Sequence, residues 1–422
     1  MAAPTVAANS SDLLLLSKPS NLLRMTAPQK PVKVIVLLHT MGYGGIETLI
    51  INWLTHIDPA KVDAKLVLFR NPGGTERPFL EAAERKGLRA EFIPWHRGKP
   101  VIRASKALQE IARKHGTQVI HSHNTYADMV AWWTARQMPV KTLGTVYVWD
   151  TKDFGIRRRI LQQISGWIFK RLDMVTAQCE ETIRDSEQWG LNPRNMRVQP
   201  TGYKIEPVNL SVDERNRLRA ERGASPDDIV VCNVARFYHE KAHDFLIDCW
   251  AKIVAQAPNA KLWLYGIGPL EEDTRKRCVA HGILDSVRFM GFTSDLDNEL
   301  ALPDIQIHPA RKEGIPLAII SGMAAGLPLV ATRVGGIPEV VEDHVSGRLA
   351  DYGDMQTIVD ATVELIRNPD LRQRLGQGAK RFIVEDFSIE AAARVLEQTY
   401  LDLVEGNYPG GSHVKKAGLS GR

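Results

Sequence analysis

The stretch from His308 to Arg348 restricts the possible fold of this chain more than any other part of the sequence. An apolar run ends at His308, a polar loop follows, and Glu313–Pro316 opens an apolar helix. A second apolar run, Pro328–Thr332, leads into the glycine-rich segment Gly335–Glu339. Strand, loop, helix and strand in this order predict a right-handed crossover between parallel strands. The free N–H groups at the start of such a helix favour an anion such as phosphate.

The same alternation of short β-branched runs and helical segments extends over most of the chain. It forms two series, and the second begins after 199–202. Strands that alternate with helices indicate parallel sheets. We therefore expect an α/β protein with two doubly wound, Rossmann-like domains joined near 203–210. The expected strands are 32–38, 65–69, 117–121 and 141–147 in the first domain, and 228–234, 261–265, 287–290, 305–308 and 329–332 in the second.

The predicted domain boundaries follow from this alternation of strands and helices. A chain of 422 residues is long for a single core, and two or three domains are expected. The first domain would span 31–205 and the second 206–386. Apolar residues at helical spacing predict a terminal helix at 387–405. The ends of the chain, 1–30 and 406–422, show no sustained period and are predicted to be disordered.

The composition excludes several classes of protein. No apolar run approaches the roughly 18 residues that cross a bilayer. The four cysteines form no Cys-Xaa-Xaa-Cys pair, so neither a zinc knuckle nor a disulfide framework is indicated, and a reducing cytoplasm is expected. Nucleic acid is not an expected partner, because no motif of aromatic and basic residues recurs. The net charge of +5 permits contact with an anionic membrane.

The segment from Glu313 to Glu339 resembles the donor site of the retaining glycosyltransferases of family 4. That family shows a glutamate, seven residues, a second glutamate, a Gly-Xaa-Pro strand start and a Gly-Gly-Xaa-Pro-Glu loop. Glu313, Gly326–Pro328 and Gly335–Glu339 match this pattern, whereas Ser321 stands at the second glutamate. The resemblance covers nearly all of 32–405. It implies the GT-B fold, in which two doubly wound domains face a central cleft and the terminal helix returns to the first domain.

The resemblance also assigns roles to charged residues. Arg236 ends an apolar run and Lys241 follows five positions later, at the spacing of the family's phosphate-binding cations. A diphosphate leaving group gains negative charge as the sugar bond breaks, and cations aimed at it favour the transition state. Taken alone, the same spacing also fits two surface cations. Glu313 would bind hydroxyls of the donor sugar. No metal or other cofactor is expected, because the cations and the helix end supply the positive charge.

Further donor contacts are implied around the helix that starts near Pro316. Backbone groups of Pro316, Leu317 and Ala318 would assist the phosphates, and Ser321 would replace the carboxylate that holds the ribose.

Two glycine-rich loops are further candidates for contact with the donor. Gly266 and Gly268 follow an expected strand, and a tight turn explains them as well as nucleotide contact does. Gly44 and Gly45 open a helix after the first strand, where glycine allows a ligand to approach the backbone. The family has a Gly-Gly-Xaa-Glu motif at this place.

Two side chains of the first domain are candidates for the acceptor side. His121 and His123 end one strand and Tyr147 ends the next. A metal site would need a third ligand that the sequence does not offer, so structural histidines are favoured, with His123 also a candidate for acceptor contact. Many relatives have histidine where Tyr147 stands, near the reacting sugar. Tyrosine can hydrogen-bond a sugar hydroxyl but is a poor base near neutral pH.

A basic segment, 152–171, contains six basic residues and one acid. Its apolar residues fall on one helical face, and Arg157, Arg158 and Arg159 lie together. A basic amphipathic helix can lie on an anionic membrane surface. The alternative is an ordinary helix that packs on the sheet and shows its arginines to water.

The resemblance implies a cytoplasmic enzyme that moves a sugar from a nucleotide-diphosphate sugar to a hydroxyl. Peripheral contact with the inner face of the membrane is the second option for its location. The acceptor would be a glycan or a lipid-linked intermediate in polysaccharide or glycolipid biosynthesis. Ser321 and Tyr147 leave an alternative open, in which a weakened or inactive relative binds a nucleotide sugar or a partner transferase.

Overall fold

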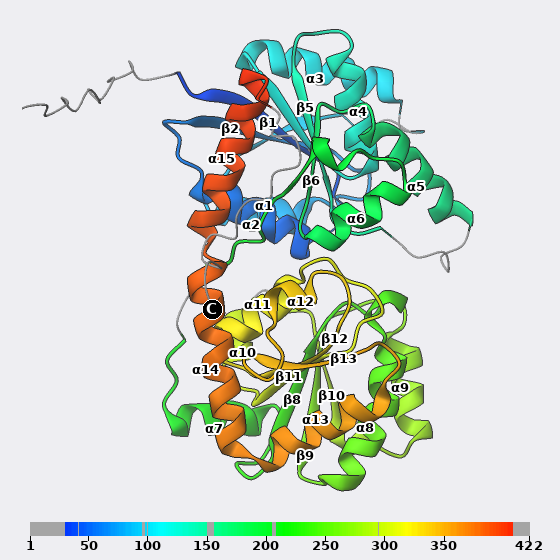
Figure 1. Cartoon of the computed structure of the whole chain (residues 1–422), viewed down its shortest axis with the longest axis vertical. Coiled ribbons are helices and arrows are strands. Elements are labelled where there is room, and N and C mark those ends of the chain that lie inside the picture. The colour runs from blue at the N-terminus through cyan, green and yellow to red at the C-terminus, as the bar shows by residue number, and fades with distance from the viewer. Residues whose placement is uncertain are drawn as a thin grey trace, which may run out of the picture. The chain divides into compact units, whose positions relative to one another are not determined.

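A computed structural model describes residues 30–40, 42–94, 98, 100–149, 156–204, 208–293 and 295–407 (Figure 1). The terminal segments predicted to be disordered lie outside these residues, except for Lys30, Gly406 and Asn407. The predicted junction near 203–210 is described only in part.

Seven parallel strands form the first sheet, in the order β3-β2-β1-β4-β5-β6-β7. The central strands, at 32–38, 119–123 and 141–146, are buried on both faces, as parallel strands covered by helices must be. The strands are β1 Val32–Leu38, β2 Val62–Phe69, β3 Ala90–Ile93, β4 Val119–His123, β5 Lys141–Val146, β6 Met174–Ala177 and β7 Met196–Val198. The helices between them are α1 Gly45–His56, α2 Arg77–Arg85, α3 Val101–His115, α4 Thr125–Ala135, α5 Ile156–Phe169 and α6 Glu180–Gln188.

Six parallel strands form the second sheet, in the order β10-β9-β8-β11-β12-β13. The strands are β8 Ile229–Val234, β9 Ala260–Tyr265, β10 Val287–Gly291, β11 Ile305–His308, β12 Leu329–Thr332 and β13 Gly347–Ala350. The helices are α7 Val212–Glu221, α8 His243–Gln256, α9 Glu271–Ala280, α10 Leu296–Leu300, α11 Leu317–Ala324, α12 Ile337–Val340, α13 Met355–Arg367, α14 Pro369–Asp386 and α15 Ile389–Glu405. Helices α8, α9 and α13 share one core cluster with β8–β11, while α11 and α14 share another with β12 and β13.

The strand order reverses at one point in each sheet. In the first sheet β1 lies between β2 and β4, and in the second β8 lies between β9 and β11. Ligands of open α/β sheets bind beyond the carboxyl ends of the strands at such a switch point. Loops that follow β1, β4, β8 and β11 are therefore the places where a site is expected.

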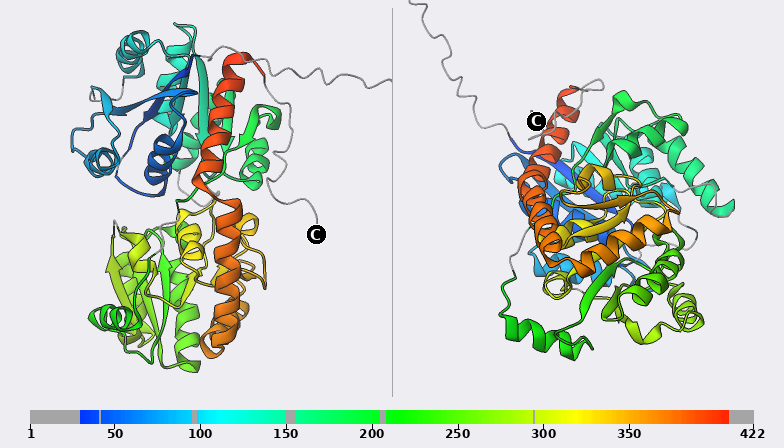
Figure 2. Two further views of the ribbon diagram at one scale, coloured as in Figure 1. Left: turned by 90° about the vertical axis from the view of Figure 1, so that its left-hand side faces the viewer. Right: turned by 60° about the horizontal axis from the view of Figure 1, so that its bottom comes forward.

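The terminal helix, α15, packs against the first sheet (Figure 2). Leu396, Tyr400 and Leu403 of α15 are buried in one core with residues of β1 and α1. Ser388 caps the helix by accepting a hydrogen bond from the Ala391 N–H, so the helix starts two residues later than predicted. Gly202 leaves room for this packing, because a Cβ there would lie 2.6 Å from the Cβ of Ala392.

Strands β3, β6, β7 and β13 are absent from the sequence-based prediction. Each has three or four residues, too few to show a period that distinguishes a strand from a loop. Within the described ranges, no helix combines the length and the apolar character needed to cross a membrane.

Candidate functional site

Three polar side chains meet at the switch point of the second sheet. Lys241 comes from the short turn after β8, and His308 ends the neighbouring strand β11. Glu313 lies in the loop between β11 and α11. The Glu313 Oε1 atom accepts hydrogen bonds from Lys241 Nζ at 2.5 Å and from His308 Nε2 at 2.7 Å. The pairing of β8 with β11 brings these residues together across about seventy positions of sequence.

The charge state of Glu313 follows from these contacts. Burial opposes ionisation of its carboxyl group. The positive charge of Lys241 and the hydrogen bond from His308 outweigh that effect and lower the pKa of Glu313 to about 2. Glu313 is therefore ionised at neutral pH, a buried anion held by a cation and a ring N–H.

The glycine-rich loop after β12 packs directly on Glu313. Gly335 has φ +57°, and a Cβ there would overlap the carbonyl oxygen of Glu313. The N–H of Gly336 donates to the carbonyl oxygen of Gly314 at 2.9 Å. Both positions require glycine, since a side chain at Gly335 would displace the Glu313 backbone and a Cβ on Gly336 would lie 2.5 Å from Cγ1 of Ile315.

Glu339, the last residue of the matched loop, contacts the start of α6. Its Oε1 atom accepts hydrogen bonds from the Glu180 N–H at 3.0 Å and the Glu181 N–H at 3.4 Å. In return, the Gly335 N–H donates to Glu181 Oε1 at 3.2 Å. A carboxylate is favoured at a helix N-terminus. Sequence reasoning missed this role, because nothing local to Glu339 indicates a helix that begins 159 positions earlier.

Arg236 is not part of the cluster around Glu313. Its side chain is 64% exposed, 4.0 Å from Glu240, and lies over the ring of Tyr238. In the described part of the chain, Arg236 makes no hydrogen bond or ion pair with Lys241 or Glu313. The two cations of the predicted phosphate clamp thus have different surroundings, one largely buried and one in solvent.

The glycines after β9 are explained by packing. A Cβ on Gly266, which has φ +135°, would overlap the carbonyl oxygen of Ala235, and one on Gly268 would lie 2.6 Å from the carbonyl oxygen of Phe237. Both positions therefore require glycine for the close approach of two loops.

Gly44 and Gly45 have more space around them. A Cβ on Gly44 would have Glu47 as its nearest neighbour at 3.6 Å, and one on Gly45 would lie 3.9 Å from Leu317. The N-terminus of α1 is therefore near the start of α11, and packing does not require glycine at either position.

Helix α11 starts at Leu317, and Pro316 is its N-cap in extended conformation. By position, the N–H groups of Leu317 and Ala318 have no partner within the helix. Ser321 is buried, and its hydroxyl donates to the carbonyl oxygen of Leu317 at 2.9 Å.

The histidines at the end of β4 are fully buried in a polar network. His121 contacts Tyr400 Oη and Thr145 Oγ1 through its two ring nitrogens, each at 2.8 Å. His123 Nδ1 lies 2.8 Å from Tyr147 Oη. Burial lowers the pKa of His123 to about 3, so the ring is neutral. Over the described ranges, no three His, Cys, Asp or Glu side chains are arranged to hold a metal ion.

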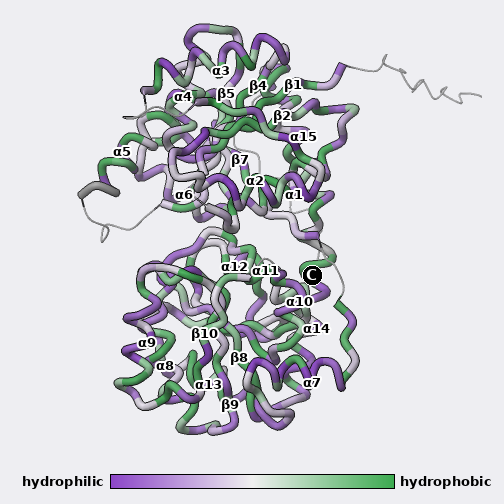
Figure 3. Tube along the Cα trace, turned by 180° about the vertical axis from the view of Figure 1, so that it is seen from behind, coloured by the Kyte–Doolittle hydropathy of each residue, from purple (hydrophilic) through white to green (hydrophobic). Residues whose placement is uncertain are grey.

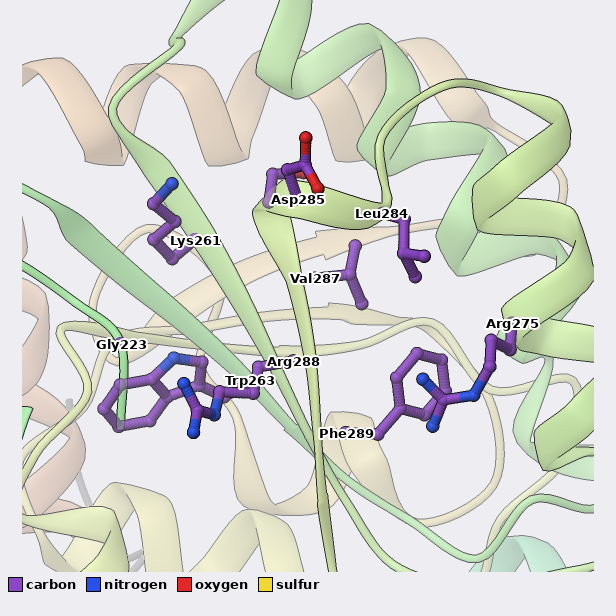
Figure 4. Close-up of a pocket in the computed structure, with 10 residues that line it drawn as sticks. Gly223, Lys261, Trp263, Arg275, Leu284, Asp285, Val287, Arg288 and Phe289 are labelled. Atoms are coloured by element: carbon purple, nitrogen blue, oxygen red, sulfur yellow. The ribbon is translucent and has the colours of Figure 1, made fainter. Parts of the chain in front are cut away.

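A hollow of about 320 Å³ lies elsewhere, at the edge strand β10 (Figure 4). Lys261, Trp263 and Arg288 line it, together with Gly223. Lys261 and Val287 stand at the amino ends of β9 and β10, opposite the edge that carries Glu313. This hollow is distinct from the cluster of Lys241, His308 and Glu313.

Two family models match the chain. One is described as glycosyl transferases group 1 and matches residues 214–382, and the other, described as glycosyltransferase family 4, matches residues 43–206. The chain belongs to the family 4 glycosyltransferases. The prediction of a GT-B fold with two doubly wound parallel sheets is confirmed.

Individual glycosyltransferases show the same relationship. N-acetyl-alpha-D-glucosaminyl L-malate synthase of Bacillus anthracis is 28% identical over 318 residues, which cover 73% of this chain and 80% of the relative. A GDP-mannose-dependent phosphatidylinositol monomannoside mannosyltransferase of Corynebacterium glutamicum is 24% identical over 82% of this chain and 91% of its own length. HepE of Anabaena, solved with UDP and glucose, has the same fold with a TM-score of 0.78 and 19% identity, over 88% of this chain and 100% of HepE.

Proposed function

We propose that this glycosyltransferase is a retaining enzyme that moves a sugar from a nucleotide-diphosphate sugar to a hydroxyl acceptor in glycan or glycolipid biosynthesis. The observation that carries the proposal is the contact of Lys241 and His308 with Glu313 at the switch point of the second sheet. HepE, which shares the fold, was solved with UDP and with UDP-glucose, and the Corynebacterium relative is dependent on GDP-mannose.

The proposed roles follow from charge and position. Lys241 supplies a cation for the diphosphate, whose charge grows as the bond to the sugar breaks. Glu313 accepts hydrogen bonds from sugar hydroxyls, because an ionised carboxylate is a strong acceptor and His308 and Lys241 keep it ionised. The N–H groups that open α11 add to the positive potential at the phosphates. Arg236, on the surface near this edge, is the second candidate to bind the leaving diphosphate. No metal is needed in this account.

Two measurements test whether the anomeric configuration of the donor sugar is retained. A thermal-shift panel of nucleotide sugars identifies the donor, because a ligand of the folded state raises Tm. NMR of the first product formed then gives its anomeric configuration. The proposal requires the configuration of the donor. Inversion at the anomeric carbon would reject the retaining mechanism but would still agree with glycosyl transfer.

We further propose that the enzyme works in the cytoplasm against an anionic membrane surface, where it meets a lipid-linked acceptor. Helix α5 supports this part of the proposal, and Figure 3 shows hydrophobic and hydrophilic residues along it. Ile160, Leu161 and Trp167 are 50%, 53% and 46% exposed, whereas Ile168 and Phe169 are buried. The buried residues fit the alternative of a helix that packs on its own domain, and the exposed apolar residues support the membrane proposal.

Basic and aromatic residues surround the exposed apolar side chains of α5. Arg171 lies 3.6 Å above the ring of Trp167, and the centroid of the Trp132 ring is 5.1 Å from that of Trp167. Arg159 and Lys170 are exposed, and the helix itself contains no acidic residue. Arg157 and Arg158 have side chains outside the described part of the structure. Tryptophan and arginine beside apolar side chains suit the headgroup region of an anionic bilayer.

Replacing Arg159, Lys170 and Arg171 by alanine is expected to weaken binding to anionic vesicles by about 1 kcal/mol per cation at low salt. Sedimentation with phosphatidylglycerol vesicles, at low and high salt, measures the effect. High salt should reduce binding of the parent protein, because surface charges are screened.

The matched control removes the same charge from α3, at the exposed residues Arg103, Lys106 and Lys114. This control should bind vesicles like the parent. Equal losses for both variants would show a general charge effect, and absent binding of the parent would reject the membrane proposal.

Replacing Ser321 by glutamate is expected to tighten the binding of a nucleoside diphosphate by about 1 to 2 kcal/mol, as a charged hydrogen bond to the ribose is restored. Calorimetry with the parent and the variant measures it, and Ser321→Gln, of equal length but without charge, is the control. Weaker binding in the glutamate variant, together with no turnover in the parent, would favour the alternative of an inactive relative. In that case the new carboxylate would be buried without a partner.

A further inference from the structure

The hollow at the edge strand β10 takes no part in the proposed transfer reaction. Lys261 and Trp263 of β9 and Arg288 of β10 line it. Arg288 pairs with Trp263 across the two strands, and Lys261 stands two positions before Trp263. Because side chains alternate along a strand, all three lie on the same face of the sheet. Figure 4 shows them on one side of β10.

The polar groups of these three side chains are hydrogen-bond donors. Lysine and arginine are cations that donate and do not accept, and the indole N–H of tryptophan is also a donor only. Within the part of the chain that the structure describes, none of the three side chains forms a hydrogen bond or an ion pair. Trp263 is only 1% exposed, so its Nε1–H has lost most of its contact with water without gaining an acceptor from the protein.

The backbone beyond α7 closes one side of the hollow. Gly223 has φ +78°, and a Cβ there would overlap Nη1 of Arg288. The guanidinium group therefore lies directly against the backbone at Gly223, which limits its movement. On the other face of β10, the guanidinium group of Arg275 lies 4.0 Å above the ring of Phe289. Charged and apolar surfaces thus meet at this edge of the sheet.

Positive charge predominates in the hollow. Of the described residues that line it, Asp285 alone is acidic, whereas Lys261, Arg275 and Arg288 are basic. Asp285 is exposed and forms no ion pair with any of the three, and the nearest acid to Arg275 is Glu271 at 3.7 Å. A phosphate group suits such a place, because it combines negative charge with several acceptor oxygens and arginine binds it well.

We propose that this hollow is a second ligand site, which binds a phosphate group through Lys261, Arg288 and the indole N–H of Trp263. Its volume of about 320 Å³ is that of a small-molecule site, so it can hold a phosphorylated molecule of the size of a sugar phosphate. A soluble phosphate ester and the head group of a phospholipid share this chemistry. The site does not depend on the sugar donor, because it lies at the amino ends of β9 and β10, opposite the edge that carries Glu313.

The indole N–H of Trp263 gives a local test. Two-dimensional NMR of the full chain with nitrogen-labelled tryptophan resolves the indole signals, and Trp263→Phe identifies the one that belongs to Trp263. Inorganic phosphate and glucose 6-phosphate are expected to shift this signal saturably, because a phosphate oxygen accepts its hydrogen bond. Glucose, and chloride at equal ionic strength, should leave it in place. Replacing Lys261 and Arg288 together by alanine should weaken binding about ten-fold or more.

Lys252→Ala with Arg194→Ala is the matched control. Both side chains are exposed, form no ion pair among the described residues and lie outside the hollow. This variant should bind phosphate like the parent. Calorimetry with the same variants measures the affinity without the Trp263 assignment. The proposal is wrong if neither phosphate compound shifts the Trp263 signal, if chloride shifts it equally, or if the control variant loses as much affinity as the Lys261 and Arg288 variant.

Sedimentation with phosphatidylglycerol vesicles distinguishes the two sources of the phosphate group. For a soluble ligand, the Lys261 and Arg288 variant should bind vesicles as well as the control variant does, while it loses affinity for glucose 6-phosphate. A greater loss of vesicle binding than in the control would assign the hollow to a lipid head group.

Discussion

Replacing Lys241 by alanine is expected to lower turnover by about 2 to 4 kcal/mol of transition-state stabilisation, a fall of about 30- to 1,000-fold. The side chain of Lys241 is 16% exposed, and its Nζ atom is 2.5 Å from Glu313 Oε1. Its loss removes a cation from the place where the leaving diphosphate gains charge, and it leaves the buried carboxylate with His308 alone. Steady-state kinetics with the donor measure the loss, which should fall on kcat more than on donor affinity.

Arg236→Ala is the matched control for Lys241→Ala. Arg236 stands five positions earlier, carries the same charge and is 64% exposed, so solvent screens it far more. Its replacement should cost less than that of Lys241. Unchanged turnover in a correctly folded Lys241 variant would remove this residue from the mechanism. A larger loss for Arg236 would make the exposed cation the main phosphate ligand.

Replacing Gly335 by alanine is expected to destabilise the protein by about 2 to 4 kcal/mol and to weaken nucleotide-sugar binding. The residue has φ +57°, which costs an alanine about 1 kcal/mol or more. The new Cβ would also overlap the carbonyl oxygen of Glu313, so the carboxylate that Lys241 and His308 hold would move. Calorimetric unfolding and binding of the donor measure the two effects.

Gly282 offers a matched control for the Gly335 variant. Its φ is +66°, and nothing lies within 4 Å of a Cβ built on it. Gly282→Ala should therefore show the backbone cost alone, about 1 kcal/mol, with no change in donor binding. If the two alanine variants unfold at the same temperature and bind the donor equally well, the contact between Gly335 and Glu313 affects neither stability nor donor binding.

The sequence was sufficient to predict the fold. Alternating strands and helices gave both doubly wound sheets, because parallel strands are apolar along their whole length. Lys241 and Glu313 were both among the predicted site residues, and the structure brings them into contact. His308 was missed, although it ends the strand that precedes Glu313. Its contact depends on the path of the loop, which no periodic pattern encodes.

Other features depend on packing between segments that are distant in sequence. The spacing of Arg236 and Lys241 could not show that one side chain faces solvent and the other a carboxylate. The amphipathic pattern of α5 could not show where along the helix burial ends. Gly266 and Gly268 illustrate the same limit, since the sequence left a tight turn and nucleotide contact open, and the close approach of Ala235 and Phe237 accounts for both.

Release of nucleoside diphosphate from a panel of nucleotide sugars, with the purified full chain and the Lys241→Ala variant in parallel, tests the central claim most directly. The claim predicts that at least one donor is turned over by the parent and that the variant is slower by about 30-fold or more. Release from no donor, with no binding of any nucleotide sugar, would contradict it.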